Sequence, residues 1–186
     1  MPKITTRTFL KKMTVHPIPP VYDKCSACLI LGSFPSVKSR EQGFFYGHPR
    51  NRFWPMLARI CGETMPETAE GKKSLLLRHG IALWDVIKCC EISGSSDSSI
   101  KNAVPNDIMP LLEQSKIRKI LVNGGKAWEL YQRHIAAGSN NAIIKSAAKM
   151  PSTSPANAAW SMERLLIAWG QELNHGGEIT SAAGAR

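Results

Sequence analysis

Short apolar runs alternate along the chain with segments whose apolar side chains recur every three or four positions. The runs typical of strands buried on both faces are 27–32, 81–87, 119–125 and, less strongly apolar, 142–148. Apolar spacing and boundary residues predict helices at 52–61, 73–79, 108–114, 126–136 and 156–173. Strands that alternate with crossover helices predict an α/β fold, namely a three-layer α/β/α sandwich with a central, mostly parallel four-stranded sheet.

The polar segments between these elements predict where a ligand would bind. In open sheets of parallel strands, the ligand lies beyond the carboxyl ends of the strands. We therefore expect the loops after Leu31, Val122 and Lys149 to converge on one site. The first of them, 33–51, is long and is expected to lack regular structure.

The two ends of the chain lack this periodicity. Pro17, Pro19 and Pro20 exclude regular helix, so residues 1–24 are expected to form an irregular N-terminal segment. Residues 175–186 are expected to be a disordered tail. Since single domains usually have roughly 100–200 residues, residues 1–174 of this 186-residue chain are expected to form one domain.

Composition excludes several classes of protein. An apolar fraction of 43% suffices for one core and excludes a wholly disordered, collagenous or fibrous chain. No apolar run approaches the roughly 18–20 residues of a membrane span, and the charged N-terminus lacks the apolar stretch of a secretory signal. We therefore expect a monomer in a bacterial-type cytosol or nucleoid, with no membrane contact.

The positive charge is concentrated in the first third of the chain. The formal net charge is +10, and residues 1–60 hold ten basic against two acidic residues, a balance of +8. A positive face on a small domain is expected of a protein that binds a polyanion, because each neutralised phosphate releases counterions. A solvated basic surface that only maintains solubility is the alternative.

The first loop combines hydroxyls, cations and aromatic rings. It contains Ser33, Ser36 and Lys38, then the run Phe44-Phe45-Tyr46, and it leads through His48, Arg50 and Asn51 into Phe53 and Trp54. Rings beside cations and hydroxyls suit a stacked nucleobase whose phosphates are held nearby. Phe53 and Trp54, at helical spacing, are expected to belong to the core, whereas three consecutive aromatics are hard to bury together.

The third loop places three hydroxyls between two prolines. Ser152, Thr153 and Ser154 lie between Pro151 and Pro155, ahead of a predicted helix whose amide groups favour an anion such as phosphate. Capping of that helix by Ser154 would explain one hydroxyl but not all three.

Together these blocks resemble a known family. The segments GSFPS, GFFYGHPRNRFW, LWDV, VNGGKA and MPSTSPAN, in this order over about residues 28–170, are similar to the uracil-DNA glycosylase superfamily. Within it, they most resemble the branch of deoxyinosine (hypoxanthine-DNA) glycosylases, and the stretch around HPRNRFW is shared with the mismatch-specific uracil and thymine glycosylases.

The resemblance implies a metal-free, monofunctional DNA glycosylase of α/β/α architecture. Such an enzyme flips a damaged nucleotide into a pocket and hydrolyses its N-glycosidic bond, leaving an abasic site. The transition state is oxocarbenium-like, so the site must steady the departing base and position a water. Its partner would be DNA that contains a deaminated base, most simply hypoxanthine.

The resemblance also suggests which residues act. Tyr46 falls on the aromatic that stacks on the base, whereas Phe34 stands where the mismatch-specific relatives have a water-holding asparagine. We therefore expect Asn51 to position the water and the transition state, and Asn123 to contact or support the base, since amides both donate and accept. Asn51 could instead cap the helix that follows, and Asn123 could be a turn residue.

The remaining site residues follow from their loops. We expect Ser33, Phe34, Tyr46 and His48 to contact the base, although His48 could instead only fix the loop. We expect DNA phosphates to be bound by Ser36, Lys38, Arg50, Ser152, Thr153 and Ser154, with Arg40 and Arg52 as further candidates. Asp85 and Asp97 could polarise a water but rank below the asparagines.

No metal or other cofactor is expected. Cys25 and Cys28 have the spacing of a ligand pair, but Cys61 and the adjacent Cys89 and Cys90 match no usual ligand spacing, so all five are expected to be reduced thiols. Two other functions stay open. One is excision of uracil or of a mismatched base, and the other is noncatalytic DNA binding, because Phe34 replaces a polar residue.

Overall fold

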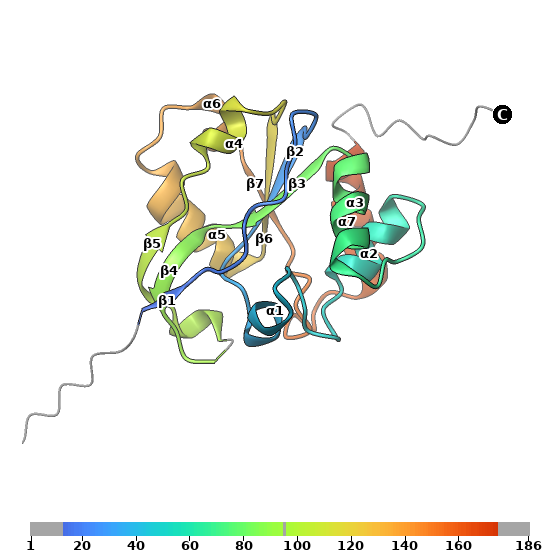
Figure 1. The fold of residues 1–186 in the computed structure, drawn as a ribbon, viewed down its shortest axis with the longest axis horizontal. Coiled ribbons are helices and arrows are strands. Elements are labelled where there is room, and N and C mark those ends of the chain that lie inside the picture. Colours follow the sequence, from blue (N-terminus) through green and yellow to red (C-terminus); the bar gives the residue numbers. More distant parts are fainter. Residues whose placement is uncertain (1–12, 95, 175–186) are drawn as a thin grey trace, which may run out of the picture.

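The computed structural model describes residues 13–94 and 96–174, and Figure 1 shows their arrangement. Four parallel strands form the central sheet in the order β3 (Ile81–Asp85), β2 (Cys28–Gly32), β6 (Lys119–Asn123) and β7 (Ala148–Met150). Every neighbouring pair in this sheet is parallel. The three-layer α/β/α fold with a parallel four-stranded sheet is therefore confirmed.

Alternate side chains of the central strands enter two separate cores. Ile30, Leu83 and Leu121 face the helices α2 (Phe53–Ile60), α3 (Ala69–Arg78) and α7 (Met162–Asn174). Leu29, Leu31 and Val122 face the other layer, which contains α4 (Met109–Glu113), α5 (Gly125–Tyr131) and α6 (Ala142–Lys145). In Figure 1 these two groups of helices lie on opposite sides of the sheet. Burial on both faces explains why the strands are continuous apolar runs.

A second, antiparallel sheet was not expected from the sequence. It has the order β1 (Thr14–Val15), β4 (Ile87–Glu91) and β5 (Lys101–Pro105), with the short 3-10 helix η1 (Asp97–Ser99) between its last two strands. Val21 also forms an antiparallel bridge with Leu83. Within the described residues 13–24, Thr14, Val15 and Val21 pair with strands, and the other residues form no helix or strand. Residues 1–12 and the predicted tail, 175–186, lie outside the described residues.

Three further predictions of local structure are wrong. The loop 33–51 contains a helix, α1 (Val37–Gln42), which Ser36 caps by accepting a hydrogen bond from the Ser39 amide. The segment predicted as a strand at 142–148 is α6, capped by Asn141, and only its last residue belongs to β7. The last helix begins at Met162 rather than at Ala156, while the π-helix η2 (Gln132–Ala136) continues α5 as predicted.

Candidate active site

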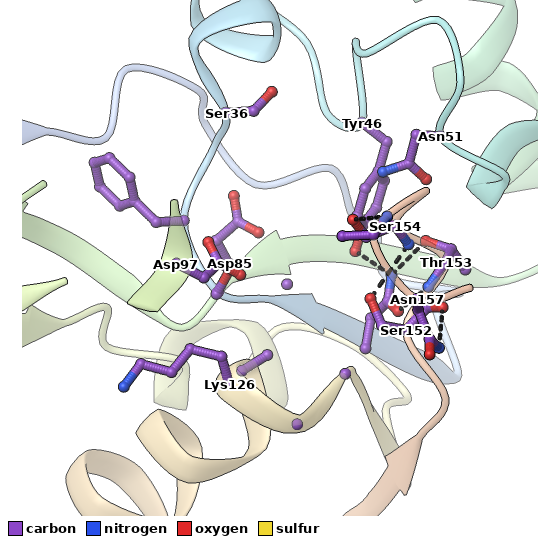
Figure 2. A pocket seen from close by; sticks show the side chains of 18 of the residues that line it. Ser36, Tyr46, Asn51, Asp85, Asp97, Lys126, Ser152, Thr153, Ser154 and Asn157 are labelled. Atoms are coloured by element: carbon purple, nitrogen blue, oxygen red, sulfur yellow. Dashed lines mark hydrogen bonds between the residues drawn. The ribbon is translucent and has the colours of Figure 1, made fainter. Parts of the chain in front are cut away.

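A cavity of about 960 Å³ opens at the carboxyl ends of the parallel strands. Its lining comes from the ends of β2, β3, β6 and β7 and from the loops that follow them, so the three predicted loops converge (Figure 2). Gly124 allows two of these loops to meet, because a Cβ there would lie 2.9 Å from the Cβ of Ser152 and its φ is +101°. The volume is in the usual range for ligand pockets, roughly 300–1,000 Å³.

One side of this cavity is built from uncharged groups, and Figure 2 shows Tyr46, Asn51 and Thr153 there. Asn123 is bonded to Tyr46 and Thr153, and we call these four residues the amide wall. Asn123 is its centre. Its Nδ2 donates to the Tyr46 hydroxyl at 3.1 Å and to Thr153 Oγ1 at 3.0 Å, and its Oδ1 accepts from the Thr153 amide at 3.1 Å. Asn123 is therefore more than a turn residue, since it joins the first loop to the third.

Tyr46 forms a rigid aromatic surface in this wall. Its ring stacks on Phe53 with the centroids 4.0 Å apart, and its φ of +53° is a strained conformation for a residue other than glycine. Burial, and secondarily the nearby Asp85 carboxylate, raises the pKa of its hydroxyl. Tyr46 thus stays protonated, and because its oxygen accepts from Asn123, its own proton remains available to donate.

Asn51 both caps a helix and lines the cavity. Its Oδ1 accepts from the Phe53 amide at 3.0 Å, so the capping alternative is correct as far as this oxygen is concerned. The same residue is part of the cavity lining, beside Tyr46 (Figure 2). Capping occupies the oxygen and leaves the Nδ2 group as a hydrogen-bond donor.

Arg52 is an internal clamp rather than a DNA contact. Its Nη2 donates to the carbonyl oxygens of Ser154 and Asn157 at 2.7 and 3.0 Å, and its Nη1 donates to the carbonyl of Trp160. These bonds hold the third loop against the start of α2. An arginine directly before a helix in a basic segment gives no sequence signal that separates this role from phosphate binding.

The expected phosphate contacts fall into three groups. Ser36, Ser152 and Ser154 line the cavity, and Lys38 and Arg50 are exposed outside it. Thr153 lines the cavity but is completely buried and bonded to Asn123, so its hydroxyl does not face solvent.

Two residues of the first loop that are expected to contact the base, His48 and Phe34, also make contacts within the protein. His48 is absent from the cavity lining, and its Nδ1 accepts from the Arg50 amide at 3.2 Å, which fixes the loop. Phe34 lines the cavity but is only 6% exposed, with its ring edge-on to His16 at 5.8 Å and Arg40 Cζ 5.7 Å from its centroid. Most of the Phe34 surface is therefore packed inside the protein.

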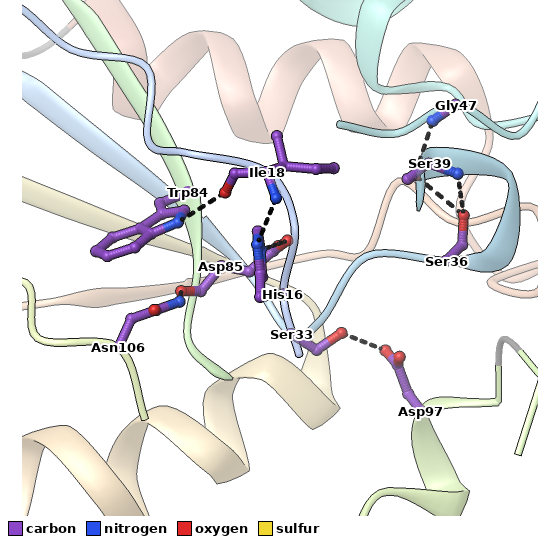
Figure 3. A network of polar contacts seen from close by, with 10 residues as sticks. All are labelled: His16, Ile18, Ser33, Ser36, Ser39, Gly47, Trp84, Asp85, Asp97 and Asn106. Atoms are coloured by element: carbon purple, nitrogen blue, oxygen red, sulfur yellow. Dashed lines mark hydrogen bonds and ion pairs between the residues drawn. The ribbon is translucent and has the colours of Figure 1, made fainter. Parts of the chain in front are cut away.

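The other side of the cavity, the carboxylate wall, consists of Asp85, Asp97 and Ser33 (Figures 2 and 3). Asp85 ends β3 and is 4% exposed, and its Oδ2 lies 2.8 Å from Nε2 of the buried His16. Asp97 belongs to η1, and its Oδ2 accepts from the Ser33 hydroxyl at 2.7 Å. Gly32 makes room for this wall, because a Cβ there would lie 2.2 Å from Asp85 Oδ1.

The protonation of His16 can be inferred from its second contact. Its Nδ1 accepts from the Ile18 amide at 3.2 Å, so the neutral ring carries its proton on Nε2 and donates it to Asp85. Asp85 is then a hydrogen-bond acceptor. Sequence reasoning missed His16 entirely, although an aspartate at the end of an apolar strand signals that a buried partner is needed.

The described residues contain no metal-binding group and no membrane helix. No set of three or more His, Cys, Asp or Glu side chains is placed to hold a metal ion in the described ranges. None of the five cysteines, all of which lie in the described ranges, forms a disulfide. None of the helices in the described part of the chain is long and apolar enough to cross a membrane.

Comparison with known proteins identifies the family of this chain. The model of the Uracil DNA glycosylase superfamily matches residues 19–173, which include both walls of the cavity but not His16, which binds Asp85. The chain belongs to the uracil DNA glycosylase superfamily. The resemblance seen in the sequence motifs is thereby confirmed.

Two curated relatives of this chain carry a more specific name. The Hypoxanthine DNA glycosylase of Methanosarcina acetivorans is 37% identical over 148 residues, which are 78% of this chain and 90% of that protein. The Hypoxanthine DNA glycosylase of Methanosarcina barkeri is 35% identical over 130 residues, 69% of this chain and 82% of that protein.

A solved structure of a related protein has the same fold as this chain. The solution NMR structure of a Methanosarcina acetivorans protein, proposed to be a uracil DNA glycosylase, superposes with a TM-score of 0.72 at 32% identity. The match covers 90% of this chain and all of that one.

Proposed function

We propose that this protein is a monofunctional DNA glycosylase that removes hypoxanthine from DNA. The flipped deoxyinosine would enter the cavity, and hydrolysis of its N-glycosidic bond would leave an abasic site. The observation that carries this proposal is the cavity itself, at the carboxyl ends of the parallel strands, where an aromatic ring, two amides and two carboxylates converge. The names of the two Methanosarcina relatives support hypoxanthine as the base.

In this proposal the amide wall binds the nucleotide and stabilises the transition state. Tyr46, backed by Phe53, offers a rigid platform and a hydroxyl donor to the base. The Nδ2 group of Asn51 positions the water and stabilises the charge that develops as the bond breaks. Asn123 supports both by fixing Tyr46 and the third loop.

The proposed DNA contacts lie around the mouth of this cavity. Ser36, Ser152 and Ser154 would bind phosphate oxygens next to the flipped nucleotide, and the exposed Lys38 and Arg50 would bind phosphates farther along the strand. Ser33 and Phe34 would shape the base site from the other side. We further propose that the enzyme acts as a monomer in the cytoplasm or nucleoid and needs no metal.

Cleavage of defined oligonucleotides tests the proposal. Purified protein in buffer with EDTA would be incubated with duplexes that contain deoxyinosine, deoxyuridine or deoxyxanthosine, and abasic sites would then be cleaved with alkali. We expect cleavage at deoxyinosine. Cleavage at deoxyuridine alone would show a uracil enzyme, as the name proposed for the structural relative suggests. Cleavage at none would leave noncatalytic DNA binding.

A further inference from the structure

We propose that Asp97 is the general base of the reaction: its carboxylate accepts a proton from the attacking water while Ser33 holds the carboxylate in place. This proposal rests on the proposed function and adds a step to it. The reaction needs such a group, because an amide such as Asn51 can orient a water but cannot take its proton at neutral pH. Phe34 leaves no acid or amide at that position of the first loop.

The structure supplies the missing carboxylate from another element. Asp97 lies on η1, 64 residues after Ser33, yet its Oδ2 is 2.7 Å from the Ser33 hydroxyl (Figure 3). Ser33 directly precedes Phe34, so Asp97 is tied to the same stretch of backbone that carries Phe34. Both Asp97 and Ser33 line the cavity. A carboxylate is thus held at the first loop, whose own acidic residue, Glu41, is exposed and does not line the cavity.

Asp97 fits a general base better than Asp85 does. Asp85 is 4% exposed, and its Oδ2 is bound by His16, whose ring is in turn fixed by the Ile18 amide. Among the residues that the structure describes, Ser33 is the one side chain that donates a hydrogen bond to Asp97, and Asp97 is more accessible than Asp85. Asp85 is therefore held more firmly than Asp97, and the Asp97 carboxylate is the better placed of the two to accept a proton from water.

The electrostatic surroundings of Asp97 agree with this role. Burial raises the pKa of the Asp97 carboxyl, and the Asp85 carboxylate raises it further, whereas the Ser33 hydroxyl and the Lys126 ammonium group lower it. A pKa moved from the ordinary range towards neutrality favours general-base catalysis. The titratable groups that interact with Asp97 are Asp85 on β3, Lys126 on α5, Tyr46 in the first loop and Cys90 on β4.

The step balances in atoms and charge. As the C1′–N9 bond breaks, its electron pair leaves with hypoxanthine, and the sugar becomes oxocarbenium-like. The water oxygen bonds to C1′, one water proton passes to Asp97, and the hypoxanthine anion later takes a proton from solvent. The two carboxylates of this wall also favour the positive charge on the sugar.

Single-turnover rates on duplex deoxyinosine, measured against pH and corrected for spontaneous depurination, test the proposal. A base must be ionised, so the wild-type rate should fall as the pH falls through the pKa of Asp97. Asp97→Asn should lower the rate about 10²–10³-fold and abolish this acid limb. Its affinity for an uncleavable 2′-fluoro analogue should stay near the wild-type value, and its melting temperature should not fall.

Two neighbouring variants should move the acid limb in opposite directions. Ser33→Ala removes a hydrogen bond that lowers the pKa of Asp97, so the limb should shift to higher pH. Asp85→Asn removes a charge that raises this pKa, so the limb should shift to lower pH. A merely structural role of Asp97 would produce neither shift. Glu113→Gln, an exposed carboxylate on α4, is the matched control and should keep the wild-type rate and limb.

Three results would overturn the proposal. Asp97→Asn could keep a rate within about threefold of wild type, or lose affinity for the analogue in proportion to its rate. Alternatively, Asp85→Asn could abolish the limb while Asp97→Asn keeps it. Wild-type protein that cleaves no lesion would instead overturn the proposed function and this step with it, so the two failures are distinguishable.

Discussion

The amide wall and the carboxylate wall face each other across the cavity, but they are held together differently (Figure 2). In the amide wall, Asn123 makes three hydrogen bonds to Tyr46 and Thr153, and no formal charge is present. In the carboxylate wall, the Asp85 carboxylate is close enough to Asp97 to raise the pKa of the Asp97 carboxyl. The amide wall therefore adds no charge repulsion to the free energy of folding, whereas the carboxylate wall brings two like charges together.

This difference indicates that the two walls have different roles in the reaction. A fully bonded amide wall is preorganised, so it can bind a nucleotide and stabilise charge without rearranging during the reaction. Like charges held together oppose folding and persist where chemistry needs them. We therefore expect variants of the amide wall to affect rate and stability in the same direction, and variants of the carboxylate wall to affect them in opposite directions.

The largest effect is expected from Asn51. Asn51→Ala removes the Nδ2 donor of the cavity and should lower the single-turnover rate about 10²–10³-fold, the usual loss for one donor to a developing charge. Affinity for the uncleavable analogue should change less than about threefold. Because Asn51 Oδ1 also caps α2, the variant should lose about 1 kcal/mol of unfolding free energy.

Asn51→Asp separates the two roles of this residue. It keeps an oxygen to accept the Phe53 amide but has no donor. The rate should therefore fall as in Asn51→Ala, while stability in urea stays close to that of wild type. If Asn51→Asp were as active as wild type, the amide would have only a capping role.

Asn123 should give the next largest effect. Asn123→Ala removes three hydrogen bonds and leaves the buried Thr153 amide unsatisfied, so the unfolding free energy should fall by about 2–4 kcal/mol and the rate should fall with it. Urea unfolding and single-turnover kinetics measure the two. The exposed Asn140→Ala is the control, expected within about 0.5 kcal/mol of wild type. Unchanged stability would mean that Asn123 does not join the loops.

The two walls also differ in how much the sequence could predict. The strands β2, β3 and β6 are apolar on both faces, and their loops carry the motifs, so the sheet, the cavity and most of the amide wall follow from the pattern. The two carboxylates of the carboxylate wall come from LWDV and a serine-rich stretch, where no periodicity indicates what Asp97 contacts. Its partner Ser33 is 64 residues away, and only the folded chain brings them together.

Three features were missed, two because tertiary contacts decide them and one because a local helix cap outweighs the strand propensity of the segment. Thr14 and Val15 are too few to show a strand pattern and pair with Cys90 and Cys89 of β4. The segment 142–145 is helical because Asn141 accepts from the amides of Ile143 and Ile144, although its isoleucines suit a strand. Arg52 was read as a phosphate contact because nothing in the sequence shows that three carbonyl groups of a distant loop surround it.

The smallest expected effect is a pH-dependent change in melting temperature, and it tests the carboxylate wall most directly. A carboxyl whose pKa is raised by folding stabilises the protein below its unfolded pKa, about 3.9, and this contribution is lost as the pH rises through the folded pKa. Asp97→Asn does not titrate, and its amide oxygen can still accept from Ser33. The variant should therefore melt about 1–3 °C above wild type at pH 7, with the difference shrinking towards pH 4. A difference that is independent of pH, or a less stable variant at pH 7, would mean that the two carboxylates do not oppose folding, and the contrast between the walls would then be one of chemistry alone.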